Sequence, residues 1–241
     1  MRLMDNTYTI GIVGGMGTYA TIAFFKRLAD AYIADKEWER PRIIIDNYCT
    51  LPSRVRAALY NERRDELVAK LSDSINNLIN AGSTRIVLAC NTSHIFIPEV
   101  CSKLNIDESK IVNIIDECGK QMSAEGVEAA YILASEGTIE SRIYETTMNK
   151  YNIVIHNPVE DEYDKIRYYI ECVKKNNLSS DVLKDFSSYL NNCNDNDIIL
   201  GCTELPILYE QCKKNKYDIH KDIYDPLESV INVFVSEYVK E

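Results

Sequence analysis

The stretch Ile86-Val-Leu-Ala-Cys-Asn-Thr92 returns in altered form as Ile198-Ile-Leu-Gly-Cys-Thr203. Each copy consists of a short apolar run, a small residue, a cysteine and then hydroxyl or amide side chains. Short continuous apolar runs are typical of strands that are buried on both faces of a parallel sheet. The repeat therefore predicts a duplicated α/β unit with one cysteine, Cys90 or Cys202, at a strand end in each half.

The rest of the chain alternates between strand-like and helical patterns. Apolar runs lie at residues 9–13, 43–45, 85–89, 111–115, 129–133, 153–155 and 198–200, and helical patterns lie between them. Helices between parallel strands cover both faces of the sheets. We expect an α/β fold of two similar Rossmann-like domains with parallel sheets, related by a pseudo-twofold axis. Residues 1–105 with 210–241 are expected to form the N-terminal domain and residues 106–209 the second, with the active site in the cleft between them.

The composition is that of an ordinary globular protein, with 241 residues, 46% hydrophobic and 27% charged. No apolar run approaches the ~18–20 residues that span a bilayer, and no signal-like apolar core precedes the first strand. The net charge is −10 and no dense Lys/Arg block is present. We therefore expect a cytoplasmic protein whose partners include neither nucleic acid nor membrane.

Cysteine usage points to thiols rather than disulfides or zinc. The eight cysteines show no CxxC spacing, and only three histidines could assist a metal site. The chain is neither short nor preceded by a secretory signal, so a disulfide framework is not expected. Most cysteines are interpreted as small buried hydrophobic residues. Cys90 and Cys202 are the exceptions, because of their matched surroundings.

Polar or glycine-rich clusters follow five predicted strands. They are Gly14–Gly17, Cys49–Arg54, Cys90–His94, Ser135–Thr138 and Gly201–Glu204. Ligands of open parallel sheets bind beyond the carboxyl ends of the strands, where a glycine turn exposes N–H groups to an anion. Asn91, Thr92 and Thr203 can donate to a carboxylate. Arg54 could hold a second carboxylate with two parallel hydrogen bonds.

Two thiols on opposite walls of one cleft suit the inversion of a carbon centre. A thiol at a helix N-terminus is expected to have a lowered pKa, and its thiolate can act as a base. Inversion at Cα needs a base on one face and an acid on the other, with the roles reversed for the opposite enantiomer. Clustered N–H and hydroxyl donors would stabilise the charge that develops on the substrate carboxylate.

At these residues the chain resembles the aspartate/glutamate racemase family. The matching segments occur in family order and spacing, and they are Ile10–Gly17, Ala89–His94, Leu133–Thr138, Leu200–Leu205 and Asp225–Pro226. The resemblance implies an isomerase that interconverts the L- and D-forms of aspartate or glutamate. It also implies that neither pyridoxal phosphate nor metal is used as a cofactor, and that the protein is a homodimer of two-domain subunits.

Carried over residue by residue, Cys90 and Cys202 match the catalytic pair of the family. The resemblance assigns a further set to the substrate's α-carboxylate and amino group, with two neighbours included: Met16, Gly17, Asn91, Thr92, Ser93, Ser135, Thr138 and Thr203. It assigns Arg54 and Lys174 to a side-chain carboxylate. Thr18 stands where a proline is usual, a departure that bears on substrate preference rather than on fold.

Several alternatives are compatible with these residues. Arg54 and Lys174 each have basic neighbours and could lie on a solvated face, and His94 is favoured as a structural hydrogen-bonding residue. The same fold could serve a hydantoin racemase, or an isomerase or decarboxylase that acts on another carboxylate. A non-catalytic amino-acid sensor is the alternative from another class. The choice between aspartate and glutamate depends on cleft width, which the sequence does not specify.

Overall fold

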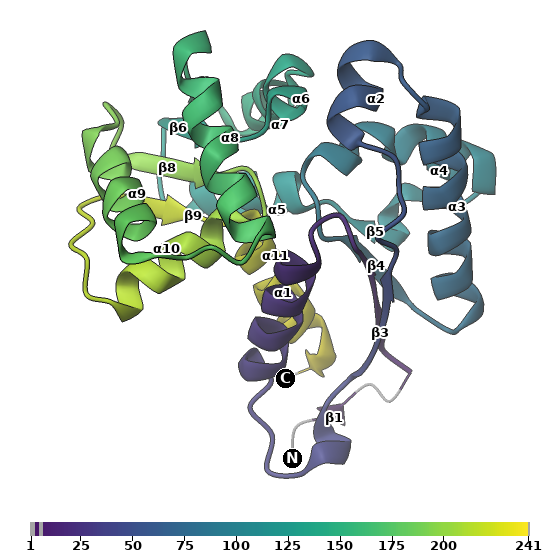
Figure 1. Cartoon of the computed structure of the whole chain (residues 1–241). Coiled ribbons are helices and arrows are strands. Elements are labelled where there is room, and N and C mark those ends of the chain that lie inside the picture. The colour runs from purple at the N-terminus through teal and green to yellow at the C-terminus, as the bar shows by residue number, and fades with distance from the viewer. Residues whose placement is uncertain (1–2, 5–6, 241) are drawn as a thin grey trace.

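The computed structural model describes residues 3–4 and 7–240, which form two four-stranded parallel sheets and one two-stranded antiparallel pair (Figure 1). The first sheet has the order β3-β2-β4-β5 and the second the order β7-β6-β8-β9. Their strands are β2 (Thr9–Gly14), β3 (Arg42–Asn47), β4 (Arg85–Leu88), β5 (Ile111–Val112), β6 (Ala129–Leu133), β7 (Val154–His156), β8 (Asp197–Leu200) and β9 (Asp222–Tyr224). The two orders coincide when β6 to β9 replace β2 to β5. The predicted duplication and the two-domain α/β fold are therefore confirmed.

Helices cover both faces of each sheet. Those that follow strands of the first sheet are α1 (Thr18–Ala31), α2 (Arg54–Tyr60), α3 (Arg64–Asn80), α4 (Ile97–Leu104) and α5 (Ile114–Ala124). Those of the second half are α6 (Glu136–Glu140), α7 (Ile143–Met148), α8 (Glu160–Lys174), α9 (Ser180–Asn192), α10 (Leu205–Lys214) and α11 (Pro226–Tyr238). Short 3₁₀ turns complete the connections: η1 (Glu37–Glu39), η2 (Thr92–Phe96), η3 (Glu108–Lys110) and η4 (Asn149–Tyr151).

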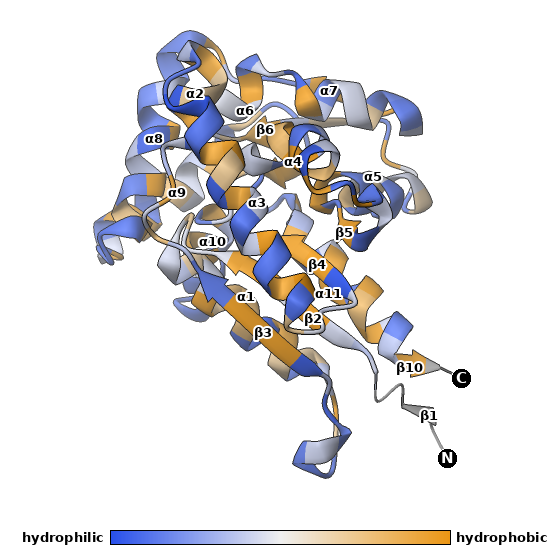
Figure 2. Ribbon diagram, turned by 90° about the vertical axis from the view of Figure 1, so that its right-hand side faces the viewer, coloured by the Kyte–Doolittle hydropathy of each residue, from blue (hydrophilic) through white to orange (hydrophobic). Residues whose placement is uncertain are grey.

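One apolar core runs through both domains. Ile10 and Ile12 of β2 share this core with Ile132 of β6 and with buried residues of α1, α5, α7 and α11. Alternate strand residues face the other way, so that Val13 packs with α3 and α4, and Leu133 packs with α8, α9 and α10. Figure 2 shows the strands as apolar bands among helices of mixed hydropathy. A shared core fixes the relative position of the two sheets, because separating them would expose its apolar surface.

The chain crosses between the domains twice. After β5 it enters α5 and reaches β6, and after β9 it returns along α11, which packs against α5 and α1. The strands β1 (Leu3–Met4) and β10 (Val239–Lys240) pair antiparallel, so a segment near the start of the chain lies beside one near its end (Figure 1). The domain boundaries expected at residues 105 and 209 stay a prediction. Strand pairing assigns residues 111–112 to the first sheet and 222–224 to the second.

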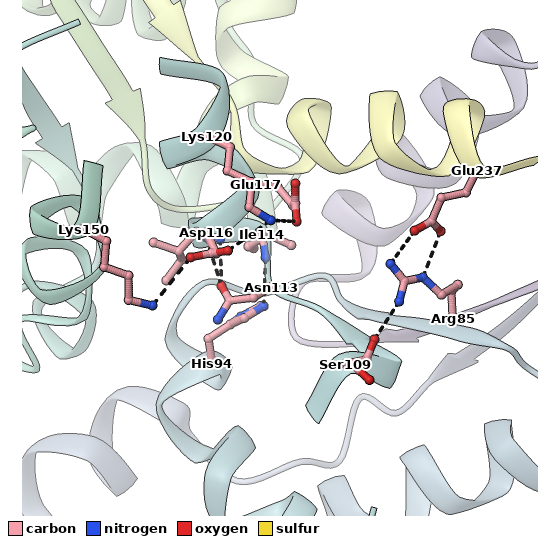
Figure 3. Close-up of polar contacts among 11 residues, drawn as sticks. Arg85, His94, Ser109, Asn113, Ile114, Asp116, Glu117, Lys120, Lys150 and Glu237 are labelled. Atoms are coloured by element: carbon pink, nitrogen blue, oxygen red, sulfur yellow. Dashed lines mark hydrogen bonds and ion pairs between the residues drawn. The ribbon is translucent and has the colours of Figure 1, made fainter. Parts of the chain in front are cut away.

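Caps and ion pairs stabilise these crossings. The strand expected at 111–115 ends at Val112, because Asn113 Oδ1 accepts hydrogen bonds from the N–H groups of Ile115 and Asp116 and thereby starts α5. Arg85 of β4 forms a two-pronged ion pair with Glu237 of α11 (Figure 3). Among the described residues, no helix has both the length and the hydropathy needed to cross a membrane.

Candidate active site

Cys90 and Cys202 lie at equivalent places in the two domains. Each follows the end of the third strand of its sheet by two residues, since β4 ends at Leu88 and β8 ends at Leu200. The two cysteine loops meet, because Thr203 Oγ1 donates to the carbonyl oxygen of Ala89 at 3.4 Å. Burial and Glu204 raise the pKa of Cys202 most, and Cys90 adds to that rise. The structure thus brings the predicted catalytic pair together from opposite domains.

Three hydroxyl groups join the same region across the domain boundary. Thr92 Oγ1 of the first domain lies 2.8 Å from Thr138 Oγ1 and 3.1 Å from Ser135 Oγ, both of the second domain. Ser135 Oγ and Thr138 Oγ1 are themselves 3.1 Å apart. Each hydroxyl can donate one hydrogen bond and accept others, so the triangle can reorient its donors toward a ligand. The sequence-based grouping of these three residues at one site agrees with their positions.

Asn91, which directly follows Cys90, has an unusual set of partners. Its Oδ1 accepts a hydrogen bond from Tyr144 Oη at 2.5 Å. Its Nδ2 is buried and has no hydrogen-bond partner within the described part of the chain. Buried donors are nearly always satisfied, so an open amide donor beside a candidate catalytic thiol marks a place for an acceptor on a ligand. The sequence motif indicates Asn91 as a site residue, whereas no motif indicates Tyr144.

Glu204 is the direct partner of the Cys202 thiol. Cys202 Sγ donates to Glu204 Oε2 at 3.0 Å, and the other carboxylate oxygen, Oε1, is buried without a partner among the described residues. Burial raises the pKa of Cys202 well above its ordinary value, and the charge and hydrogen bond of Glu204 raise it further. The expectation of a lowered thiol pKa is therefore wrong for Cys202, because burial beside a carboxylate outweighs the attraction of Lys174.

A cavity of about 360 Å³ lies beside this pair. Its lining consists of Gly17, Thr18, Tyr19, Ala20, Lys174 and Glu204. Gly17 precedes α1, and a Cβ at this position would lie 2.3 Å from Glu204 Oε1. Burial lowers the pKa of Lys174, but Glu204, Cys202 and Glu171 together raise it by more, so the ammonium form is favoured. Lys174 Nζ also donates to Glu171 Oε1 at 3.1 Å. The cavity therefore places one cation and the N-terminus of a helix, two features that attract a carboxylate, beside the carboxylate of Glu204.

Arg54 approaches the glycine turn from another direction. Its Nη2 donates to the carbonyl oxygen of the buried Met16 at 2.8 Å, and its Nη1 donates to that of Pro52 at 3.2 Å. Its Nε is buried and has no partner among the described residues. Gly15 adopts a φ of +78°, and a Cβ there would lie 2.5 Å from the backbone of Tyr48, so only glycine fits this turn. The contact of Arg54 with a substrate carboxylate stays a prediction.

Ser93 and His94 brace the Cys90 loop. Ser93 Oγ donates to the carbonyl oxygen of Cys90 at 2.7 Å, and His94 Nδ1 donates to the same oxygen at 2.9 Å. His94 Nε2 accepts from the N–H of Ile114 at 3.4 Å (Figure 3). Burial lowers the pKa of His94 to about 4, so the ring is neutral near pH 7. These contacts support a structural role for His94, because its ring links the Cys90 loop to the start of α5. A substrate contact of Ser93 stays a prediction.

Donor groups for a metal ion do not gather at this site. Within residues 3–4 and 7–240, no group of three or more His, Cys, Asp or Glu side chains is arranged to hold an ion. All eight cysteines lie in this part of the chain and are free thiols. Titratable groups of this region include the thiols of Cys90 and Cys202, the carboxylate of Glu204 and the amine of Lys174.

Fold and site together define a class of protein, in which two duplicated α/β domains present paired thiols to a shared site lined by hydroxyl and amide donors. The Asp/Glu/hydantoin racemase family matches residues 13–232. That match covers most of the chain, and the chain belongs to this family.

Individual relatives agree with that membership. The broad specificity amino-acid racemase RacX of Bacillus subtilis is 28% identical over 146 residues, which cover 58% of this chain and 60% of that protein. Picrophilus torridus aspartate racemase superposes with a TM-score of 0.78 at 24% identity, over 97% of this chain and 96% of that one. Francisella tularensis glutamate racemase in complex with D-glutamate gives 0.63 at 18% identity, over 97% and 81%. These likenesses to solved structures show the fold.

Proposed function

We propose that this protein is an amino-acid racemase that inverts the Cα of an acidic amino acid, aspartate or glutamate, with Cys90 and Cys202 as its two acid–base groups. The observation that carries the proposal is the meeting of the two strand-end cysteine loops from opposite domains. Membership of a racemase family and the similarity to RacX support the same reaction class.

The proposed reaction moves one proton off Cα and another on. One thiolate removes the α-proton, and the opposite thiol delivers its proton to the other face of the carbanion. Because Cys202 rests as a thiol whose hydrogen points at Glu204, transfer of that hydrogen to the carboxylate would generate the Cys202 thiolate. Charge that develops on the substrate carboxylate is stabilised by Asn91 and the hydroxyl triangle, which are donors already in place.

Substrate selection in this proposal depends on cations at the edge of the site. Lys174 lines the cavity beside Gly17 and Glu204, and Arg54 holds the carbonyl of the adjacent Met16. A second carboxylate on the substrate would place negative charge near one or both of them. We therefore propose a small acidic amino acid as the partner. We further propose that no cofactor is needed and that the protein acts as a cytoplasmic homodimer, an assembly that size-exclusion chromatography with light scattering would measure.

The decisive test follows the α-proton directly. Purified protein is incubated in heavy water with L-aspartate, or with L-glutamate, under reducing conditions, while proton NMR follows the Cα–H signal and polarimetry follows optical rotation. We expect both signals to decline together. Cys90→Ala and Cys202→Ala are each expected to abolish the decline in rotation, whereas Cys101→Ala, which removes a buried thiol of α4, is expected to retain it.

Three results would each contradict a part of the proposal. Racemisation that survives in Cys202→Ala would exclude the two-thiol mechanism. Binding of aspartate or glutamate to the wild-type protein without exchange of the α-proton would indicate a sensor rather than an enzyme. Exchange with a hydantoin or another carboxylate, but with neither amino acid, would keep the chain within its family and change its substrate.

A further inference from the structure

We propose that Tyr144 is a positioning residue that orients the Asn91 amide, so that Nδ2 faces the α-carboxylate of the substrate. The inference rests on the proposed function, and it assigns a role to a residue outside the cysteine motifs. Tyr144 lies on α7 of the second domain, and Asn91 lies in the Cys90 loop of the first.

The geometry leaves little freedom to either side chain. Tyr144 is 1% exposed and Asn91 is 2% exposed, and 2.5 Å separates Tyr144 Oη from Asn91 Oδ1. Burial raises the pKa of Tyr144 well above its ordinary value, so the phenol keeps its hydrogen and can donate it. An amide whose oxygen is held in this way presents its NH₂ group on the opposite side.

The NH₂ group of Asn91 is the part that lacks a partner. Nδ2 is buried, and no described residue accepts a hydrogen bond from it. Leaving a buried donor open costs more than an average hydrogen bond contributes, so such groups are uncommon unless a ligand satisfies them. In the chain, Asn91 stands between Cys90, a candidate base, and Thr92, a member of the hydroxyl triangle. A carboxylate oxygen of the substrate is the acceptor that fits this place.

Without Tyr144, the orientation of the amide would be weakly specified. The terminal torsion of asparagine is broad and nearly two-fold, so the two ends of the amide can exchange at small cost. In the exchanged orientation, Oδ1 would face the substrate carboxylate and repel it. The Tyr144 hydrogen would also lose this acceptor while remaining buried. The hydrogen bond from Tyr144 therefore selects the orientation that can stabilise negative charge.

The test compares Tyr144→Phe with Tyr169→Phe, each of which removes one phenolic hydroxyl. Tyr169 is a matched control because it is fully buried in α8 and donates to Asp185 Oδ2 at 3.0 Å. For Tyr144→Phe we expect kcat/KM for racemisation to fall roughly tenfold, with most of the loss in kcat because the donor acts on developing charge. Tyr169→Phe is expected to keep the wild-type kcat. Equal kcat losses in the two variants would assign Tyr144 to general packing and overturn the inference.

A double-mutant cycle shows whether Tyr144 acts through Asn91. If it does, adding Tyr144→Phe to Asn91→Ala changes kcat less than about twofold, because the oriented group is already absent. If the two losses multiply instead, Tyr144 acts by another route and the positioning role is wrong.

A spectroscopic readout separates this inference from the proposed racemase activity. In ¹⁵N-labelled wild-type protein, the side-chain amide signals of Asn91 are expected to shift when L-aspartate is added, and to shift less in Tyr144→Phe. A wild-type protein that shows this shift but exchanges no α-proton would retain the positioning role and overturn the racemase proposal. Racemisation without any shift of the Asn91 amide would retain the enzyme and overturn the positioning role. The wild-type titration needs no variant to fold.

Discussion

The thiol of Cys202 donates its hydrogen to Glu204 Oε2 at 3.0 Å, and Glu204 is among the groups that hold the pKa of this thiol high. A thiol with a raised pKa stays protonated near neutral pH, so it can act as a base only after another group accepts its proton. Glu204 is 3% exposed, and its other oxygen has no partner in the described part of the chain. In the proposed reaction, the carboxylate that suppresses the thiolate at rest would receive the thiol proton.

Glu204→Gln is expected to change reactivity and activity in opposite directions. Loss of the negative charge removes a cause of the raised pKa of Cys202, so alkylation of this thiol by iodoacetamide near neutral pH should accelerate. Loss of the proton acceptor should slow α-proton exchange by roughly a hundredfold. Mass spectrometry of the Cys202 peptide and proton NMR in heavy water measure the two rates. Unchanged exchange together with faster alkylation would limit Glu204 to an electrostatic effect.

Gly17→Ala is expected to damage activity more than stability. The residue has an extended φ of −177°, so an alanine causes no backbone strain. Its Cβ would lie 2.3 Å from Glu204 Oε1, and rotation of the flexible carboxylate relieves that clash by moving Oε2 away from Cys202. We expect kcat to fall roughly tenfold from misplacement of the acceptor, with the melting temperature changed by less than about 4 °C.

The control for this prediction is the double variant. Gly17→Ala added to Glu204→Gln should lower kcat less than about twofold further, because the acceptor is already absent. A loss that multiplies in the double variant would mean that the methyl group blocks the cavity itself. Isothermal titration with L-aspartate would then show weaker binding to Gly17→Ala alone.

The sequence repeat is sufficient to predict the fold and the strand-end positions of Cys90 and Cys202, because both depend on local pattern. Buried strands are apolar on every residue, and the cysteines follow them directly, so the pattern alone places Cys90 and Cys202 at strand ends. The crossings are harder to place. The strand β5 has two residues and Asn113 ends it with a side-chain cap, whereas the apolar pattern continues to Ile115.

Tertiary contacts account for what the sequence does not reveal. Tyr144 lies 53 positions from Asn91, and no spacing in the sequence indicates that they meet. The direction of the Cys202 pKa also depends on such contacts. A thiol beside a helix start usually has a lowered pKa, but burial and the orientation of Glu204 reverse this, and neither can be read from the neighbouring residue types.

His94 should make stability depend on pH in a defined window. Burial lowers its pKa from the ordinary value of 6.5 to about 4, so between these values the unfolded chain binds more protons than the folded chain. His94 therefore makes its full contribution to the free energy of unfolding above pH 6.5. That contribution declines as the pH falls toward about 4. The expected loss is roughly 3 kcal/mol. Urea unfolding of the wild type and of His94→Gln measures it, and the variant should show a flatter curve.

The comparison variant is His220→Gln, which alters an exposed imidazole whose Nε2 lies 3.2 Å from Asp218 Oδ2. Carboxylates also titrate in this range. The quantity to compare is therefore the slope of the unfolding free energy against pH, in each variant and in the wild type. An identical slope in His94→Gln would show that the imidazole does not stay neutral in the folded protein.

Lys174→Met should reveal whether the cavity recognises a second carboxylate. Methionine keeps an apolar stem but removes the ammonium, so kcat/KM for aspartate or glutamate should fall roughly 10–100-fold, chiefly through KM. Lys174 also lowers the pKa of Cys202, so its loss should raise that pKa further and shift the pH dependence of kcat toward alkaline values.

L-alanine, which lacks the second carboxylate, separates the two effects of Lys174→Met. A KM increase confined to acidic substrates would place Lys174 on the substrate, whereas an equal loss for alanine would place it on the thiol alone. Lys175→Met, which alters the neighbouring exposed lysine, should leave both substrates unaffected.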